Sequence, residues 1–293
     1  MIGIGEFFAL ASAFAWGVAV ILFRLSGQQL GPFALNLFKN VLMLVLLTPT
    51  ILVAHGTAWP AISAGNWAVL LLSGFIGIGI ADTLFFRALN SLGPSRTAIG
   101  SMLLSPFVIL LSFAFLGERL GALQWFGVVL TLVGVTVVNW RRTHPLAPKA
   151  DRSGVLALGA AMALMASGIV MAKPALETEP FIWAVQIRVI GGVGGMLIMM
   201  WVQRRQARVL AEFARATAWK RTIAASFVGT YVAMLMWLAG YKYADASIAA
   251  VLNETSAVFV LILAAVFLKE RMVARQWLGS LLAAIGVLVV VAG

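Results

Sequence analysis

Two stretches of the chain, residues 89–138 and 241–290, align with each other at a constant offset of 152 residues and without a gap. Both copies share an acidic-basic pair, a glutamine-tryptophan pair and two glycines: Glu118, Arg119, Gln124, Trp125, Gly127 and Gly134 match Glu270, Arg271, Gln276, Trp277, Gly279 and Gly286. The chain is therefore a tandem duplication. Because the repeated unit is almost entirely apolar, we expect it to lie in a membrane, where internal repeats are typical of transporters.

Charged residues make up 11% of the chain and hydrophobic residues 62%, with a mean hydropathy of +1.02. A soluble domain carries roughly 25% charged residues, so this composition excludes a water-soluble fold. Since a helix of about 20 apolar residues crosses the bilayer, the sequence predicts an all-α integral membrane protein with ten transmembrane helices. The predicted spans are 5–24, 32–54, 66–88, 95–116, 121–140, 154–173, 180–202, 221–241, 246–268 and 274–292.

Lysine and arginine are concentrated in alternate loops. Sixteen of them lie at residues 24–31, 87–96, 141–153, 203–221 and 269–275, whereas the other loops hold only Arg119, Lys173 and Lys242. Because basic loops stay in the cytoplasm, the formal charge of +11 indicates membrane topology, and we expect no nucleic-acid partner. The localisation predicted is the inner (cytoplasmic) membrane, with both termini outside. Cysteine is absent, which excludes disulfides, thiolate metal sites and cysteine nucleophiles, and no cofactor is expected.

Five spans per copy is an odd number, so the second copy must enter the membrane from the opposite side. The prediction is two inverted five-helix repeats, 1–140 and 154–293, around a central cavity, which is the geometry of alternating access. The segment 141–153 is expected to be an exposed basic linker. Residues 203–221 carry apolar side chains at roughly helical spacing among basic ones. This segment is either a basic topogenic loop or a short interfacial helix that binds anionic lipid.

Four ionisable residues fall within predicted spans: Lys39, Asp82, Arg188 and Glu254. Lys39 and Asp82 are expected at one depth, and Arg188 and Glu254 at another depth nearer the opposite face. Charges inside a membrane are costly and require a partner or a function. One hypothesis is two structural ion pairs. The other is that Arg188 and Lys39 bind a substrate carboxylate or phosphate, while Glu254 or Asp82 exchanges a coupled proton.

Other polar or bulky residues within spans extend the candidate site. Asn253 places polar atoms beside Glu254, and Pro106 leaves the carbonyl of Met102 without its usual helical partner, which predicts a substrate contact, a bending point or a packing kink. Trp16, Tyr231 and Trp237 either line the cavity or fill the bundle. Glycines in the spans, among them Gly127, Gly134, Gly191, Gly279 and Gly286, predict close helix packing, with a flexible gate near Gly191 as the alternative. Glu118 and Glu270 are expected to stabilise tight turns.

The order of these motifs resembles the EamA family of the drug/metabolite transporter superfamily. The resemblance rests on Trp16-Gly17, on Ser95, Pro106 and Gly117-Glu118-Arg119-Leu120, and on Asn253-Glu254-Thr255 and Leu268-Lys269-Glu270-Arg271. It implies ten helices formed by two five-helix repeats. The second copy has Val258 where a proline would match Pro106, so the two halves are expected to differ mechanically. Members of the family are generally described with both termini in the cytoplasm, whereas the charges here predict the reverse.

The function predicted is secondary active transport of small organic metabolites, with amino acids or related zwitterions as the first candidates and export as the direction. The chain lacks a G-x-x-x-x-G-K-[ST] phosphate loop, which disfavours ATP-driven transport. Protons are the candidate coupling ion, membrane lipid is the expected surrounding partner, and the protein is a monomer or homodimer. The alternatives are a membrane-embedded enzyme acting on lipid-linked substrates, which would require clustered catalytic groups, and a receptor or scaffold subunit.

Overall fold

The computed structural model describes residues 3–26, 30–56, 60–92, 97, 100–139, 152–267 and 274–292, and every regular element among them is a helix. The first copy holds α1 (Ile4–Ser26), α2 (Pro32–His55), α3 (Ala64–Gly74), the π-helical η1 (Phe75–Ala81), α4 (Asp82–Leu92), α6 (Leu104–Phe115) and α7 (Ala122–Asn139). The second holds α8 (Arg152–Thr178), α9 (Phe181–Val202), α10 (Gln206–Arg215), α11 (Trp219–Ser226), the π-helical η2 (Phe227–Val232), α12 (Ala233–Tyr243), α13 (Ala246–Asn253), α14 (Ser256–Phe267) and α15 (Ala274–Ala292).

The predicted spans correspond to these helices. Five stretches are long and apolar enough to cross a membrane, and five shorter apolar stretches account for the other spans within the described ranges. The prediction that the sixth span ends at Lys173 is wrong, because α8 continues through Pro174 to Thr178. Proline removes only its own hydrogen bond, and the bond from the Glu179 amide to the Ala175 carbonyl keeps the next turn helical. The predicted linker 141–153 lies almost wholly outside the described residues.

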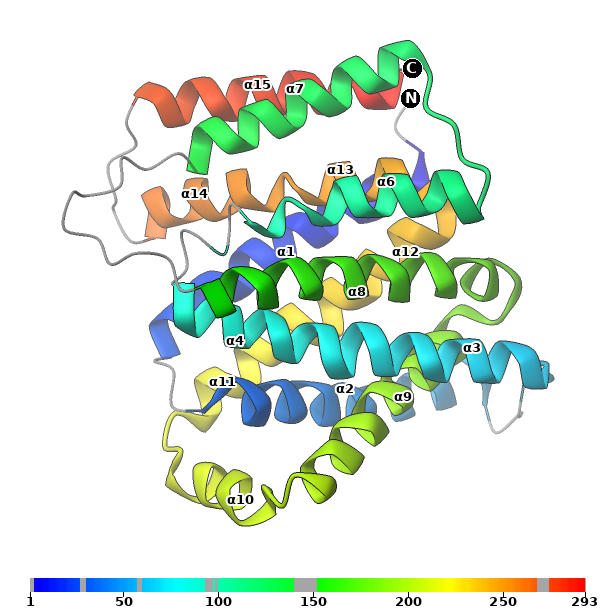
Figure 1. Cartoon of the computed structure of the whole chain (residues 1–293), viewed down its shortest axis with the longest axis vertical. Coiled ribbons are helices and arrows are strands. Elements are labelled where there is room, and N and C mark those ends of the chain that lie inside the picture. Colours follow the sequence, from blue (N-terminus) through cyan, green and yellow to red (C-terminus); the bar gives the residue numbers. More distant parts are fainter. Residues whose placement is uncertain are drawn as a thin grey trace.

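The helices are stacked side by side in one elongated bundle (Figure 1), with α7 and α15 at one edge and α2, α9 and α10 at the other. Both chain ends lie together at one end of the helices, which we call the termini end. At the other end, the start of α2 shares a pocket with Arg87 of α4 and with Arg205 and Arg208, which follow α9, and we call this the basic end. Chain ends at the same end of the helices are what an even number of crossings requires.

Glycines bring α7 and α15 into close contact, and the contacts are symmetric. A Cβ placed on Gly127 would lie 2.8 Å from the carbonyl oxygen of Gly286, and one on Gly134 would lie 2.7 Å from that of Gly279. The 152-residue offset converts the first of these contacts into the second. Such reciprocity is what a twofold axis produces between antiparallel helices, so the two copies are inverted repeats. Close packing, the first interpretation of these glycines, is confirmed.

Irregular backbone also recurs at matching positions. The π-helical η1 begins at Phe75 and η2 at Phe227, which are 152 residues apart. A turn at Met102–Leu103 precedes α6, and the matching turn at Glu254–Thr255 separates α13 from α14.

Only the first of these two turns is followed by a proline, Pro106. The second has Val258 there, and the Val258 amide instead donates to the carbonyl of Thr255, three residues back. Both copies therefore interrupt corresponding helices. The first interruption is followed by a proline, and the second by an amide that donates to the carbonyl three residues back.

Candidate functional site

Lys39 and Asp82 form an ion pair between α2 and α4, as their predicted depth required. Lys39 Nζ lies 2.8 Å from Asp82 Oδ2, and the two side chains are only 7% and 15% exposed. Asp82 is the first residue after η1, and the Lys39 ammonium also lies 5.8 Å from the centre of the Phe86 ring. The pair thus joins the second helix to the irregular part of the third.

Two buried asparagines on α2 complete this region, and the sequence analysis missed both. The Asn36 amide donates to the carbonyl of Ile78 in η1 at 3.0 Å, and the Asn40 amide donates to Asn36 Oδ1 at 2.9 Å. Lys39 and Asn40 follow Asn36 by three and four residues, which places all three on one face of the helix. A polar stripe on an otherwise apolar span was the signal that could have revealed them.

Arg188 on α9 is 1% exposed, and glycines make room for it. A Cβ on Gly77 would lie 3.1 Å from Arg188 Nη2, and one on Gly74 would overlap the Arg188 carbonyl oxygen. Neither Nε nor Nη1 of Arg188 makes a hydrogen bond with a described residue. The predicted second ion pair, with Glu254, is absent from the described part of the chain: the carboxylate that acts electrostatically on Arg188 is Asp82.

Glu254 lies in the turn between α13 and α14, and its carboxylate accepts a hydrogen bond from Ser105 Oγ on α6 at 2.8 Å. The interrupted helices of the two copies therefore meet at this carboxylate. Asn253 and Thr255 add fewer free polar groups than expected. The Asn253 side-chain amide donates to the carbonyl of Ala249, and the Thr255 hydroxyl donates to that of Leu252, both in α13.

Tyr241 on α12 is fully buried, and its hydroxyl group has no hydrogen-bond partner among the described residues. It interacts electrostatically with both Glu254 and Arg188, and its ring meets that of Trp237 edge to face at 5.1 Å. Sequence reasoning missed Tyr241 because it sits at the predicted end of a span, where burial is not evident. We refer to Lys39, Asp82, Arg188, Tyr241 and Glu254 as the central polar cluster.

The remaining predicted site residues differ in their burial and contacts. Tyr231 in η2 is partly buried, shares a short hydrogen bond with Thr50 Oγ1 and stacks on Phe227. Trp16 on α1 and Pro106 in the first turn of α6 are half-buried, as is Trp237. Tyr231 thus ties α2 to η2, whereas Trp237 is the predicted aromatic residue that touches the central polar cluster directly.

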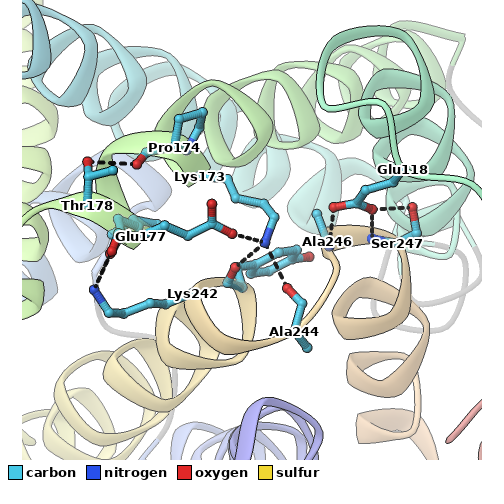
Figure 2. A network of polar contacts seen from close by, with 11 residues as sticks. Glu118, Lys173, Pro174, Glu177, Thr178, Lys242, Ala244, Ala246 and Ser247 are labelled. Carbon is cyan, nitrogen blue, oxygen red and sulfur yellow. Dashed lines mark hydrogen bonds and ion pairs between the residues drawn. The ribbon is translucent and has the colours of Figure 1, made fainter.

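At the termini end, two lysines link α8 to α12 (Figure 2). Lys173 donates to the carbonyls of Tyr241 and Ala244, each at 2.8 Å, and pairs with Glu177. Lys242 donates in the opposite direction, to carbonyls at the end of α8, including that of Glu177 at 3.4 Å. Both lysines were predicted in loops, but Lys173 is buried inside a helix. Carbonyls that a helix end leaves without partners are thereby satisfied by the neighbouring helix.

Glu118, which belongs to the first copy, contacts the start of α13 in the second copy at this same end of the bundle. Its carboxylate accepts hydrogen bonds from the amides of Ala246 and Ser247 at 2.7 and 3.0 Å and from the Ser247 hydroxyl at 2.8 Å. Only the backbone of Glu118 serves its own turn, where its amide donates to the carbonyl of Ser112 beside Gly117, with φ +71°. The carboxylate instead caps α13 of the other copy, which the sequence did not predict. Burial, with the negative charge of Glu118, raises the pKa of the adjacent Asp245 above its ordinary value of 3.8.

Two pockets open at opposite ends of α2 and α9. The pocket at the basic end has a volume of about 520 Å³ and is lined from Pro32 on α2 to Gln203 beyond α9. The pocket at the termini end, about 450 Å³, includes Thr48 on α2 and Gln186 on α9. Lys39 lies between these levels of α2, and no residue of the central polar cluster lines either pocket.

A sequence model described as the EamA-like transporter family matches residues 3–140 and 152–292. The chain is 29% identical to YxxF, an uncharacterised transporter of Bacillus subtilis (strain 168), over 140 residues, which are 45% of this chain and 44% of that relative. It is also 29% identical to Protein RarD of Escherichia coli (strain K12) over 179 residues, 60% of this chain and 57% of RarD. The matched segment thus spans about half the length of these curated relatives.

The fold is shared with a solved structure described only as a crystal structure of protein. The two superpose with a TM-score of 0.76 over 97% of this chain and 95% of that chain, at 17% sequence identity.

Proposed function

Because the chain belongs to the EamA-like transporter family, we propose that it is a secondary active transporter that carries a small organic metabolite with a carboxylate, such as an amino acid or related zwitterion. The observation that carries this proposal is the unsatisfied polar surface of the central polar cluster. Arg188 keeps two nitrogen atoms without hydrogen bonds to described residues. Leaving buried polar groups unpaired is costly, and a bound carboxylate would supply acceptors for the guanidinium group.

The other members of the central polar cluster indicate which residues bind substrate and which couple protons. Lys39 and Asp82 neutralise each other, so Arg188 is the cation that a substrate anion would meet. Glu254 has Ser105 as its hydrogen-bond donor and sits where α13 and α14 are interrupted. A carboxyl group at an interrupted helix can couple proton exchange to a change of helix geometry. We therefore assign substrate binding to Arg188 and Tyr241 and proton coupling to Glu254.

We propose export as the direction, and a difference between the two ends supports it. At the termini end, Lys173 and Lys242 fasten α8 to α12. At the 152-residue offset, Lys173 matches Ile21 and Lys242 matches Asn90, so the sequence has no lysine at either matching position of the first copy. With the basic loops in the cytoplasm, this arrangement favours a state that receives its substrate from the cytoplasm. Alternating access between the two ends would then export it.

Purified protein in vesicles tests the proposal. Wild type should exchange carboxylate-bearing metabolites in a panel and respond to a pH gradient. Arg188→Ala and Tyr241→Phe should weaken the binding of an amino acid but not of the amine that lacks its carboxylate. Glu254→Gln should bind substrate yet lose the response to the pH gradient.

Monodisperse elution of each variant controls for folding. Normal flux in both Arg188→Ala and Glu254→Gln would refute the roles assigned to these two residues. Product formation from a lipid-linked substrate in detergent, with no flux in vesicles, would count against transport. The latter result would favour the enzyme alternative.

A further inference from the structure

The basic-end pocket combines an apolar wall with a concentration of positive charge. Its apolar lining comes from three transmembrane helices and α10: Pro32, Phe33, Ala34, Ile80, Leu84, Met199 and Val209. Its charged lining is Arg87 from α4, with Arg205 and Arg208 at the start of α10, against a single acidic residue, Glu212. The lining therefore carries an excess of two positive charges, contributed by both copies of the repeat.

Glu212 is already engaged by other groups. Its Oε2 accepts a hydrogen bond from the Gly31 amide at 3.0 Å, and its Oε1 accepts one from Arg208 Nε at 3.3 Å. The carboxylate thus fastens α10 to the first turn of α2. Arg87 and Arg205 have no ion pair among the described residues. These two guanidinium groups can meet an anion that enters the pocket.

The surroundings of the pocket face the bilayer. On α10, Val209 points inward at 4% exposure, whereas Leu210 is 65% exposed. Trp201 and Val202, at the end of α9, are similarly exposed. An amphipathic helix with basic residues and an exposed apolar side chain lies in the interface of a membrane. The mouth of the pocket is therefore at headgroup depth, with apolar surface beside it.

We infer that this pocket binds the headgroup phosphate of an anionic phospholipid from the same leaflet. Arg87, Arg205 and Arg208 hold the phosphate, and the acyl chains lie along the apolar wall and the exposed side chains at the end of α9. A membrane lipid is the occupant because a soluble anion would leave that apolar surface unused. No residue of the central polar cluster lines the pocket, so this site is independent of the proposed substrate site.

Native mass spectrometry of the full-length protein in detergent tests the assignment. Wild type is titrated with phosphatidylglycerol and with phosphatidylcholine of identical acyl chains. The pocket variant is Arg87→Gln/Arg205→Gln/Arg208→Gln. The control variant, Arg152→Gln/Arg215→Gln/Lys220→Gln, removes the same charge from exposed residues outside the pocket.

Wild type should retain phosphatidylglycerol in preference to phosphatidylcholine. The pocket variant should lose about tenfold or more in affinity for it, since each basic group near an anionic lipid contributes appreciably, while the control stays within about twofold by the same reasoning. Arg205→Gln alone should show a smaller loss in the same direction.

Three results would overturn the inference. The first is equal retention of the two lipids by wild type, and the second is equal affinity of the pocket and control variants for phosphatidylglycerol. The third is displacement of the lipid by glycerol 3-phosphate as effectively as by short-chain phosphatidylglycerol, which would identify a site for a soluble phosphate.

Discussion

Removing either partner of the Lys39–Asp82 ion pair should destabilise the protein far more than removing both. At a separation of 2.8 Å and an effective dielectric constant of about 20, the gross attraction is about 6 kcal/mol. Much of it offsets the cost of taking two charges out of water. The expected loss for Lys39→Met or for Asp82→Asn alone is therefore about 3–5 kcal/mol, the cost of an uncompensated buried charge.

The double variant Lys39→Met/Asp82→Asn removes both charges of the pair and should regain most of this loss. Thermal denaturation of the detergent-solubilised protein, followed as the surviving monodisperse fraction, gives the four corners of a double-mutant cycle. We expect a coupling energy of about 4 kcal/mol or more between the two sites, because the two single losses add to about 6–10 kcal/mol whereas the double variant should lose only a small part of one of them. If the double variant is as unstable as the two single losses added together, the two side chains do not act as a pair and the reasoning fails.

The same variants separate the two hypotheses for this pair. If the pair only neutralises charge, the stable double variant retains transport of the substrate found in vesicles. If Asp82 carries a coupled proton, the double variant folds and binds substrate but no longer responds to a pH gradient. The structure favours the first outcome, because the pair bonds α2 to α4 whereas Arg188 keeps unsatisfied donors.

Three further predictions concern packing, charge and closure. Gly134→Ala should lower the denaturation temperature, because its Cβ would lie 2.3 Å from a backbone nitrogen of α15 and overpacking costs about 1–3 kcal/mol; Gly194→Ala, which meets open space, should not. Asp245→Asn should be more stable than wild type above the raised pKa of Asp245, because ionisation of Asp245 there disfavours the fold. This advantage should vanish as the pH falls below the ordinary pKa of 3.8. Denaturation temperatures of both proteins, measured over a pH series, check the direction of the difference. Lys173→Met should increase labelling of a cysteine placed at Ala244 by a membrane-impermeant thiol reagent, in a chain without native cysteine, and unchanged labelling would contradict its closing role.

The architecture could be predicted from the sequence because the two copies are related by one constant offset. Matching glycines at one offset predict reciprocal contacts, and α7 and α15 make them. Lys39 and Asp82 could be paired because they lie at one depth on consecutive spans, and neighbouring spans usually pack together. Depth on sequential helices was therefore sufficient to predict this contact.

Depth was not sufficient for Arg188 and Glu254. Their helices are not consecutive, and depth says nothing about the direction in which a side chain points around the helix axis. Arg188 points toward the glycines of η1, and Glu254 points toward Ser105 on α6. The capping of α13 by Glu118 was equally hidden, because it joins residues 128 positions apart through a carboxylate that local rules assign to its own turn.

The reciprocal contacts between α7 and α15 have a consequence for the history of the chain. In such an interface each partner presents the same patch, so the surface is complementary to a copy of itself. One five-helix unit could therefore have paired with a second, identical polypeptide inserted upside down, before any fusion of the two genes. Joining the two units fixed their stoichiometry at one to one. It also allowed each half to acquire features that identical subunits would have to share, such as Lys173 and Lys242 at one end of the bundle and Pro106 in the first half.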